Sequence, residues 1–211
     1  MQSQFFEKTS HGIIITDNLF ALQESNQFDN LSTELDARWN LVEKAWQLGI
    51  SPRLLNVSFD RSLEILYSLD ESAERIDATS AREALSGYQK GKCFYTFLPI
   101  STSSLAIDLC DVDHVIPHVF QSAFIKSGID LNGVWNLVLA NAETNRHDKR
   151  DKLPHARYIE RLYRRNEYYI ESNLPLAETI VNQTGRSPKH RERFLKDQMN
   201  LAIELRGHKD D

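Results

Sequence analysis

Three polar side chains that could together hydrolyse a phosphodiester bond follow one another within residues 110–154. An acidic residue and a histidine are adjacent at Asp113 and His114, and Asn145 lies further along, ahead of a run of charged residues. A neutral imidazole can take a proton from water, and oxygen-bearing side chains can hold a hard divalent cation. Hydrolysis of a phosphodiester uses both, because water must become nucleophilic while negative charge builds on the phosphate oxygens.

These residue types suggest a division of roles. His114 fits the general base, and Asp113 and Asn145 fit the ligands of a single metal ion. Two protein ligands leave the remaining octahedral positions of Mg²⁺ for water and phosphate, which is how proteins usually hold this ion. We therefore expect Mg²⁺, or Mn²⁺ in its place, as the cofactor.

The surrounding pattern predicts the elements that would bring these groups together. Alternation over residues 111–115 favours a strand, the apolar run 137–140 favours a second strand, and residues 143–149 favour a short helix packed on both. Neighbouring residues on a strand point to opposite faces, so Asp113 and His114 can share a site only where the strand ends. Pro117 supports that break, because proline cannot donate to a strand ladder.

The order Asp113, His114, Pro117, Asn136 and Asn145, with Asn145 nine positions after Asn136, resembles the HNH nucleases, also called ββα-metal or His-Me finger nucleases. The likeness is closest to the HNH domain of RNA-guided CRISPR effectors and to stand-alone bacterial HNH proteins. It covers roughly residues 32–197 and is specific in 110–154. It implies an HNH endonuclease in which Asn136 braces the loop that carries His114. Each piece alone is weak, since an isolated Asp-His pair is more often a surface ion pair.

The sequence departs from this family at the usual zinc site. Such proteins often carry two Cys-x-x-Cys pairs that hold a structural Zn²⁺. Here the first pair of positions holds Cys93 and Thr96 and the second holds Asn141 and Thr144, so no structural zinc is expected. Packing must replace it, and we expect aromatic contacts with Trp135. The residues expected to make them are Phe94, Tyr95 and Phe97.

Several basic residues after Asn145 are expected to contact the nucleic-acid backbone, namely Arg146, Lys149 and Arg150. Lys149 comes one residue later than in the commonest form of the motif. His147 lies in that altered segment and is either a further ligand or phosphate contact, or a solvated helix histidine. His118, four residues after His114, is either a phosphate contact or a packed or exposed histidine.

Charge is distributed unevenly along the chain. The net charge is −5, but residues 1–92 hold nine Lys and Arg against fourteen Asp and Glu, whereas residues 141–196 hold thirteen against eight. A basic region after the site suits a phosphate backbone lying across it. The four arginines at helical spacing could equally belong to a solvated helix face. They are Arg157, Arg161, Arg164 and Arg165.

Composition sets the class of protein. A chain of 211 residues with 41% hydrophobic residues can bury a core. No run approaches eighteen apolar residues, so no membrane span is expected, and the first eight residues do not resemble a secretory signal. Two cysteines, Cys93 and Cys110, favour a reduced, cytoplasmic protein.

Periodicity predicts an α+β fold that is mainly α-helical, and the resemblance implies a central ββα-metal finger within it. We expect a helical module over 1–90, the finger over 91–155 and a basic helical extension over 156–211. In the first module, residues 12–16 favour a strand or a docking segment, and helices are expected over 32–49, 58–69 and 80–87. The stripe Leu35, Trp39, Val42 and Trp46 should face the core. A last helix is expected over 192–205, with Pro188 at the turn before it.

The function expected from the resemblance is hydrolysis of DNA with low sequence specificity, since phosphate contacts position a protein without reading sequence. A small unselective nuclease needs control, so we expect a regulatory protein partner and a setting in bacterial anti-phage defence or restriction. One alternative is a catalytically inactive subunit that binds nucleic acid or supports assembly. Another is an RNase.

Overall fold

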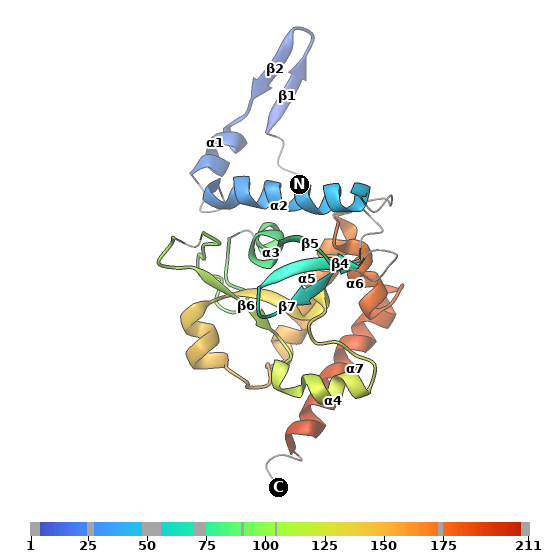
Figure 1. The fold of residues 1–211 in the computed structure, drawn as a ribbon. Coiled ribbons are helices and arrows are strands. Elements are labelled where there is room, and N and C mark those ends of the chain that lie inside the picture. The colour runs from blue at the N-terminus through green and yellow to red at the C-terminus, as the bar shows by residue number, and fades with distance from the viewer. Residues whose placement is uncertain are drawn as a thin grey trace.

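An antiparallel pair of strands, β6 (Cys110–His114) and β7 (Leu137–Asn141), lies at the centre of the fold (Figure 1). The computed structural model describes residues 5–24, 28–47, 56–69, 75–89, 91–103, 105–172 and 175–207. The register places Asp113 opposite Val138 and His114 opposite Leu137. Residues 137–140 are all buried, which explains their continuous apolar run. Both strands predicted for the finger are confirmed.

Side chains from two helices complete the hydrogen bonding of this small sheet. Helix α3 (Ala81–Gln89), predicted over 80–87, ends at Gln89, whose amide accepts from the backbone nitrogen of Leu139 at 2.7 Å and donates to its carbonyl at 2.8 Å. Helix α5 (Ala156–Glu171) places the buried Arg165 so that its guanidinium donates to the carbonyl oxygens of Val134 and Leu137. A two-stranded sheet is marginal alone, so these contacts stabilise it.

The expected helix over 58–69 is wrong, because this segment forms two strands and a turn. Strands β3 (Ser58–Asp60), β4 (Ile65–Leu69) and β5 (Arg75–Ser80) make an antiparallel sheet in that order. The chain reverses where the Asp60 carboxylate accepts hydrogen bonds from the backbone nitrogens of Ser62, at 2.9 Å, and Leu63, at 3.1 Å. Local bonding of this kind competes with a helix.

Helix α2 (Phe28–Gln47) crosses one end of this part of the molecule (Figure 1). The expected helix over 32–49 exists, but it begins earlier, and its predicted buried stripe is wrong. Ala37, Leu41 and Ala45 are buried instead, while Trp39 and Trp46 are 51% and 57% exposed and pack edge to face with centroids 5.4 Å apart. Alanines allow the helix to lie close to its neighbours, which indole rings would prevent.

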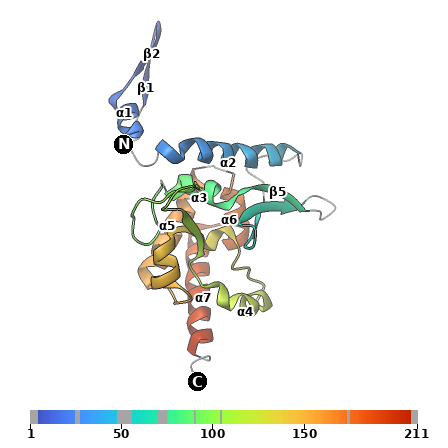
Figure 2. The ribbon, with the colours of Figure 1, turned by 60° about the vertical axis from the view of Figure 1, so that its left-hand side comes forward.

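The first described residues project from the rest of the molecule. Strands β1 (Phe6–Thr9) and β2 (Gly12–Ile15) pair as an antiparallel hairpin, and helix α1 (Asp17–Gln23) follows them (Figures 1 and 2). The strand expected near residues 12–16 is confirmed. Ile13, Ile14 and Phe20 are among the exposed apolar side chains of this arm. In the described part of the chain, no helix is long and apolar enough to cross a membrane.

The carboxyl-terminal helices pack behind the central strands. Helix α6 (Ala177–Thr184) is followed by Gly185, and the last helix, α7, begins at Pro188, four residues before the expected position 192. Its full extent is Pro188–Gly207. Helix α4 (Gln121–Lys126) occupies the connection between β6 and β7.

The aromatic contacts around the finger differ from those that were predicted to replace a structural zinc. Trp135 packs edge to face on Phe194 of α7, with ring centroids 5.0 Å apart. Phe94 and Tyr95 pack instead on Tyr158 of α5, and Phe97, which is 58% exposed, lies under the guanidinium of Arg161. The finger is therefore held by α5 and α7, which the sequence placed in a separate extension.

We expect the adjacent arginines of α5 to differ sharply in their effect on stability. Arg165→Met should lower the free energy of unfolding by about 2–4 kcal/mol, because it removes the guanidinium donor of the buried Leu137 carbonyl oxygen. Arg164→Met removes an exposed ion pair with Glu160 and should change it by about 0.5 kcal/mol or less. Urea unfolding of both variants measures the difference. Equal effects would contradict a structural role for Arg165.

Candidate active site

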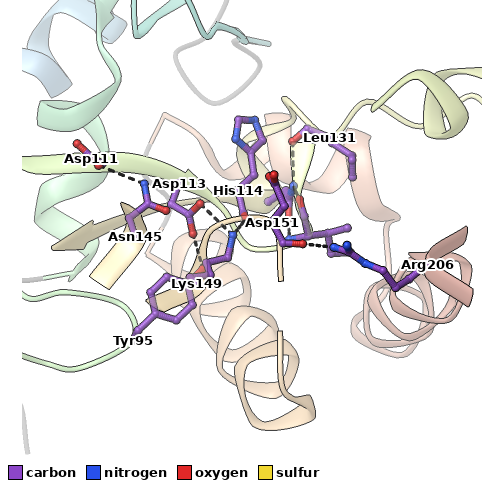
Figure 3. Close-up of polar contacts among 11 residues, drawn as sticks. Tyr95, Asp111, Asp113, His114, Leu131, Asn145, Lys149, Asp151 and Arg206 are labelled. Atoms are coloured by element: carbon purple, nitrogen blue, oxygen red, sulfur yellow. Dashed lines mark hydrogen bonds and ion pairs between the residues drawn. The ribbon is translucent and has the colours of Figure 1, made fainter. Parts of the chain in front are cut away.

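The end of β6 brings the predicted base and metal ligand to one cavity. The strand ends at His114, and the side chains of Asp113 and His114 stand on opposite sides of it (Figure 3). Both nevertheless line a cavity of about 210 Å³, together with Asn145 and Lys149. The residues predicted to act together are thus adjacent in space, at the point where the chain leaves the strand.

The Asp113 carboxylate is buried and has a donor at each oxygen. The hydroxyl of Tyr95 donates to Oδ2 at 2.5 Å, and the ammonium of Lys149 lies 3.0 Å from Oδ1 (Figure 3). Lys149 also donates to the backbone carbonyl of His114. Burial raises the pKa of Asp113, and the nearby Lys149 charge and the Tyr95 hydroxyl oppose that shift. Tyr95 was not predicted as part of the site.

His114 is held as a neutral ring. Burial lowers its pKa to about 3, so the imidazole carries no charge near neutral pH. Its Nε2 lies 2.9 Å from the side-chain oxygen of Asn132. An amide oxygen can only accept, so Nε2 carries the hydrogen and Nδ1 keeps its lone pair. The ring is therefore in a form that can accept a proton, through Nδ1.

Asn136 ties together the loops on both sides of the site. Its side-chain oxygen accepts from the backbone nitrogen of Ile116 at 2.8 Å, and its nitrogen donates to the carbonyls of Ile116 and Leu131 at 3.0 Å each. The residue is fully buried. This arrangement fixes the chain immediately after His114, and its effect on catalysis stays a prediction.

The short helix that carries Asn145 is wider than an α-helix. Thr144–Lys149 forms a π-helix, closed by a hydrogen bond of 2.9 Å from the backbone nitrogen of Arg150 to the carbonyl of Asn145, five residues earlier. Such a turn accommodates one more residue than an α-helical turn. Lys149 comes one residue later than in the commonest motif, and the wide turn still places it beside Asn145 in the cavity.

The oxygen atoms present suit a cation that keeps most of its water. Asn145 donates through Nδ2 to Asp111 at 3.2 Å, which turns its Oδ1 away from that carboxylate. With Asp113 this makes two oxygen ligands, a set that fits Mg²⁺ and is too small for structural zinc. No group of three His, Cys, Asp or Glu side chains suited to a metal occurs among the described residues. Lys149 supplies the positive charge beside Asp113 in this structure.

The residues predicted to contact phosphate differ in whether they are already paired with a carboxylate. Arg146 donates to both oxygens of Asp111, at 2.8 and 3.0 Å, and Lys149 is paired with Asp113. Arg150 and His118 line the cavity. The side chain of His147 is exposed. Contact of any of them with a substrate stays a prediction.

Three other members of the site were missed by sequence reasoning. Asp111 could have been found, because it lies two residues before Asp113 and therefore on the same face of β6. Asn132 and Arg61 gave no local signal. Arg61 comes from the turn between β3 and β4 and reaches His118, with its Nη1 3.3 Å from Nδ1 of that ring.

Hydrogen bonds join residues at the positions where the resemblance would place zinc-binding cysteines. The backbone nitrogen of Asn141 donates to the sulfur of Cys93 at 3.3 Å. The side-chain oxygen of Asn141 accepts from the backbone nitrogens of Glu143, at 3.0 Å, and Thr144, at 3.3 Å. The loop at Cys93 is thereby joined to the start of the π-helix by direct contacts among Cys93, Asn141 and Thr144, which stand at three of the four expected zinc positions.

Comparison with known proteins identifies the same region. Residues 93–155 match the model of a family described as HNH endonuclease. No curated protein and no solved structure matches the chain significantly. The match covers both strands, the π-helix and each residue predicted as base, brace or metal ligand.

We expect His114 to make the protein less stable in acid. The pKa of the ring is about 3 when folded and about 6.5 when unfolded, so between these values the unfolded chain binds a proton that the folded protein does not. The free energy of unfolding therefore falls as pH falls below about 6.5, by at most about 2 kcal/mol at pH 5 from this group. Urea unfolding at both pH values should show a smaller loss in His114→Asn. The same loss in both proteins would contradict a buried neutral ring.

Proposed function

We propose that this protein is a metal-dependent endonuclease that hydrolyses phosphodiester bonds in DNA, because residues 93–155 match the model of a family described as HNH endonuclease. The observation that carries the proposal is one cavity lined by the neutral His114, the Asp113 carboxylate and Asn145. These groups provide a base and two oxygen ligands, which are the parts that such a hydrolysis needs.

In the proposed mechanism, Nδ1 of His114 takes a proton from the attacking water. Asn132 holds the ring in the required tautomer, and Asn136 holds the loop that follows it. Asp113 and Asn145 would hold Mg²⁺, or Mn²⁺, whose charge stabilises the phosphate oxygens. Tyr95 keeps the Asp113 carboxylate in place through its short hydrogen bond.

We propose that substrate is bound through its backbone and with little sequence specificity. Arg150 and His118 line the cavity and could donate to phosphate, while Arg146 and Lys149 would have to exchange a carboxylate partner for a substrate oxygen. Phosphate contacts carry no information about sequence.

We propose control by a protein partner, in an anti-phage defence or restriction setting and in the cytoplasm. The support is an apolar outer face on α2, where Leu35, Trp39 and Trp46 are exposed in an acidic part of the chain. A surface of this kind suits protein contact better than contact with DNA.

A second candidate is a nucleic-acid-binding or assembly subunit without catalysis. The observation that favours it is the pairing of Lys149 with Asp113, which neutralises the carboxylate without a metal. The motif does not separate DNA from RNA, so an RNase stays an alternative, and the same assay on RNA distinguishes it.

Plasmid cleavage in Mg²⁺ or Mn²⁺ tests the proposal. We expect nicking or linearisation that EDTA abolishes and that His114→Ala slows by about 100-fold or more, since a general base contributes at least that much. His11→Ala, in the projecting hairpin, should cleave like the unaltered protein and serves as the matched histidine control.

Mn²⁺ titration separates the role of the general base from that of the metal ligands. His114→Ala should keep the affinity for Mn²⁺, because it removes the base and leaves both oxygen ligands, whereas Asp113→Asn should lose it. Cleavage that survives in His114→Ala would contradict the assignment of the base. If the unaltered protein neither cleaves nor binds Mn²⁺, the non-catalytic candidate replaces the nuclease.

A further inference from the structure

Arg61, a residue of the amino-terminal sheet, faces the active-site cavity of the finger. It lines the same cavity as Asp113, His114 and Asn145, although it precedes them by 52, 53 and 84 residues in the sequence. Its guanidinium Nη1 lies 3.3 Å from Nδ1 of His118, whose ring centroid is 5.0 Å from that of His114. The site therefore receives a cationic side chain from outside residues 93–155.

The turn that presents Arg61 is held from both sides. Asp60 accepts from the backbone nitrogen and the hydroxyl of Ser62, at 2.9 and 2.6 Å, and Arg75 pairs with its other oxygen at 2.6 Å. At the far end of the turn, the carbonyl of Glu64 accepts from the backbone nitrogen of Ala81 at 3.0 Å. The position of the backbone at Arg61 is thus fixed before any ligand binds.

Among the residues that the structure describes, no carboxylate forms an ion pair with Arg61, whereas other arginines around the finger have acidic or carbonyl partners. Arg82 pairs with Glu64 and Arg146 with Asp111, while Arg165 donates to backbone carbonyls. Within the described ranges, the side chain of Arg61 has the neutral ring nitrogen of His118 as its polar partner. A guanidinium with spare donors at the mouth of a cavity is suited to an anion.

A second hollow, of about 560 Å³, continues from the first on the far side of these two residues. Arg61 and His118 line both, and Phe59, Ser62, Tyr67 and Asp60, whose carboxylate is paired with Arg75, line only the second. Arg61 and His118 therefore stand between the cavity that holds Asp113 and a further stretch of open surface. An anion bound by them would lie beside the reacting group and not at it.

We propose that Arg61, with His118, binds the backbone phosphate next to the scissile phosphate, so that the nucleic-acid strand continues over the β3–β4 turn. The inference rests on the proposed nuclease function and adds a subsite to it. A guanidinium can donate two hydrogen bonds to one phosphate, and a neutral histidine can donate a third. The amino-terminal sheet then forms part of the substrate-binding surface.

The test measures binding of a short fluorescent single-stranded oligonucleotide in the His114→Ala background, where cleavage is suppressed. Adding Arg61→Ala should weaken binding by roughly ten-fold, and Arg61→Lys less, because lysine keeps the charge but not the fork. The slope of log K against log salt should become shallower by about 0.7 for the lost phosphate contact. Arg164→Ala, an exposed arginine away from this cavity, is the charge-matched control and should leave both unchanged.

Cleavage kinetics, measured in protein that retains His114, provide a second readout. Arg61→Ala should raise KM with kcat largely retained, because it removes a contact made equally in the ground and transition states. Unchanged affinity, slope and KM in a protein that cleaves would overturn the Arg61 subsite and leave the nuclease intact. A loss of kcat alone would also overturn it, by placing Arg61 at the scissile phosphate. If the unaltered protein neither binds nor cleaves nucleic acid, both proposals fall.

Discussion

The finger is built around one buried negative charge. Asp113 is 7% exposed and receives a hydrogen bond from Tyr95 on one side and the ammonium of Lys149 on the other. Removing Lys149 would leave an uncompensated charge in the interior, which costs several kcal/mol, and removing Tyr95 would leave one buried carboxylate oxygen without its donor. The loop that carries Tyr95 and the π-helix that carries Lys149 must therefore close on the same carboxylate. The Asp113 carboxylate, which is proposed to bind a cation, thus also forms contacts that the local fold requires.

The pairing of Asp113 is one of several contacts that can stabilise the finger although it has a single cysteine at its expected zinc positions. Cys93 and Asn141 are joined by a hydrogen bond, and Arg165 and Gln89 satisfy backbone groups of the two central strands. Contacts of this kind also account for part of the excess of basic residues in the second half of the chain. Arg161 donates to the carbonyls of Phe94 and Tyr95, so part of the excess of arginine belongs to the core and not to a phosphate surface.

Features set by neighbouring residues could be predicted, and features set by distant contacts could not. The strand end at His114 and the apolar strand 137–140 follow from short patterns and are confirmed. The false helix over 58–69 arose because Phe59 and Leu66, seven apart, also fit one face of a helix. They are in fact cross-strand partners, and the signal that decides between the two is the turn formed by Asp60 and Ser62. Which face of α2 is buried depends on the distant elements that pack against it, and no local sequence pattern predicts those contacts.

The π-helix shows how an apparent departure in sequence can preserve a site. Asn145 and Lys149 are separated by one residue more than in the commonest motif, and an α-helical turn with that insertion would rotate one of them relative to the other. The bond from Arg150 to Asn145 spans five residues and absorbs the insertion within a single turn, so both side chains still line the cavity with Asp113. Lys149 must reach a buried carboxylate, and this requirement gives a physical reason for a wider turn. The spacing of such motifs is therefore better judged by the atoms that must meet than by the number of residues between them.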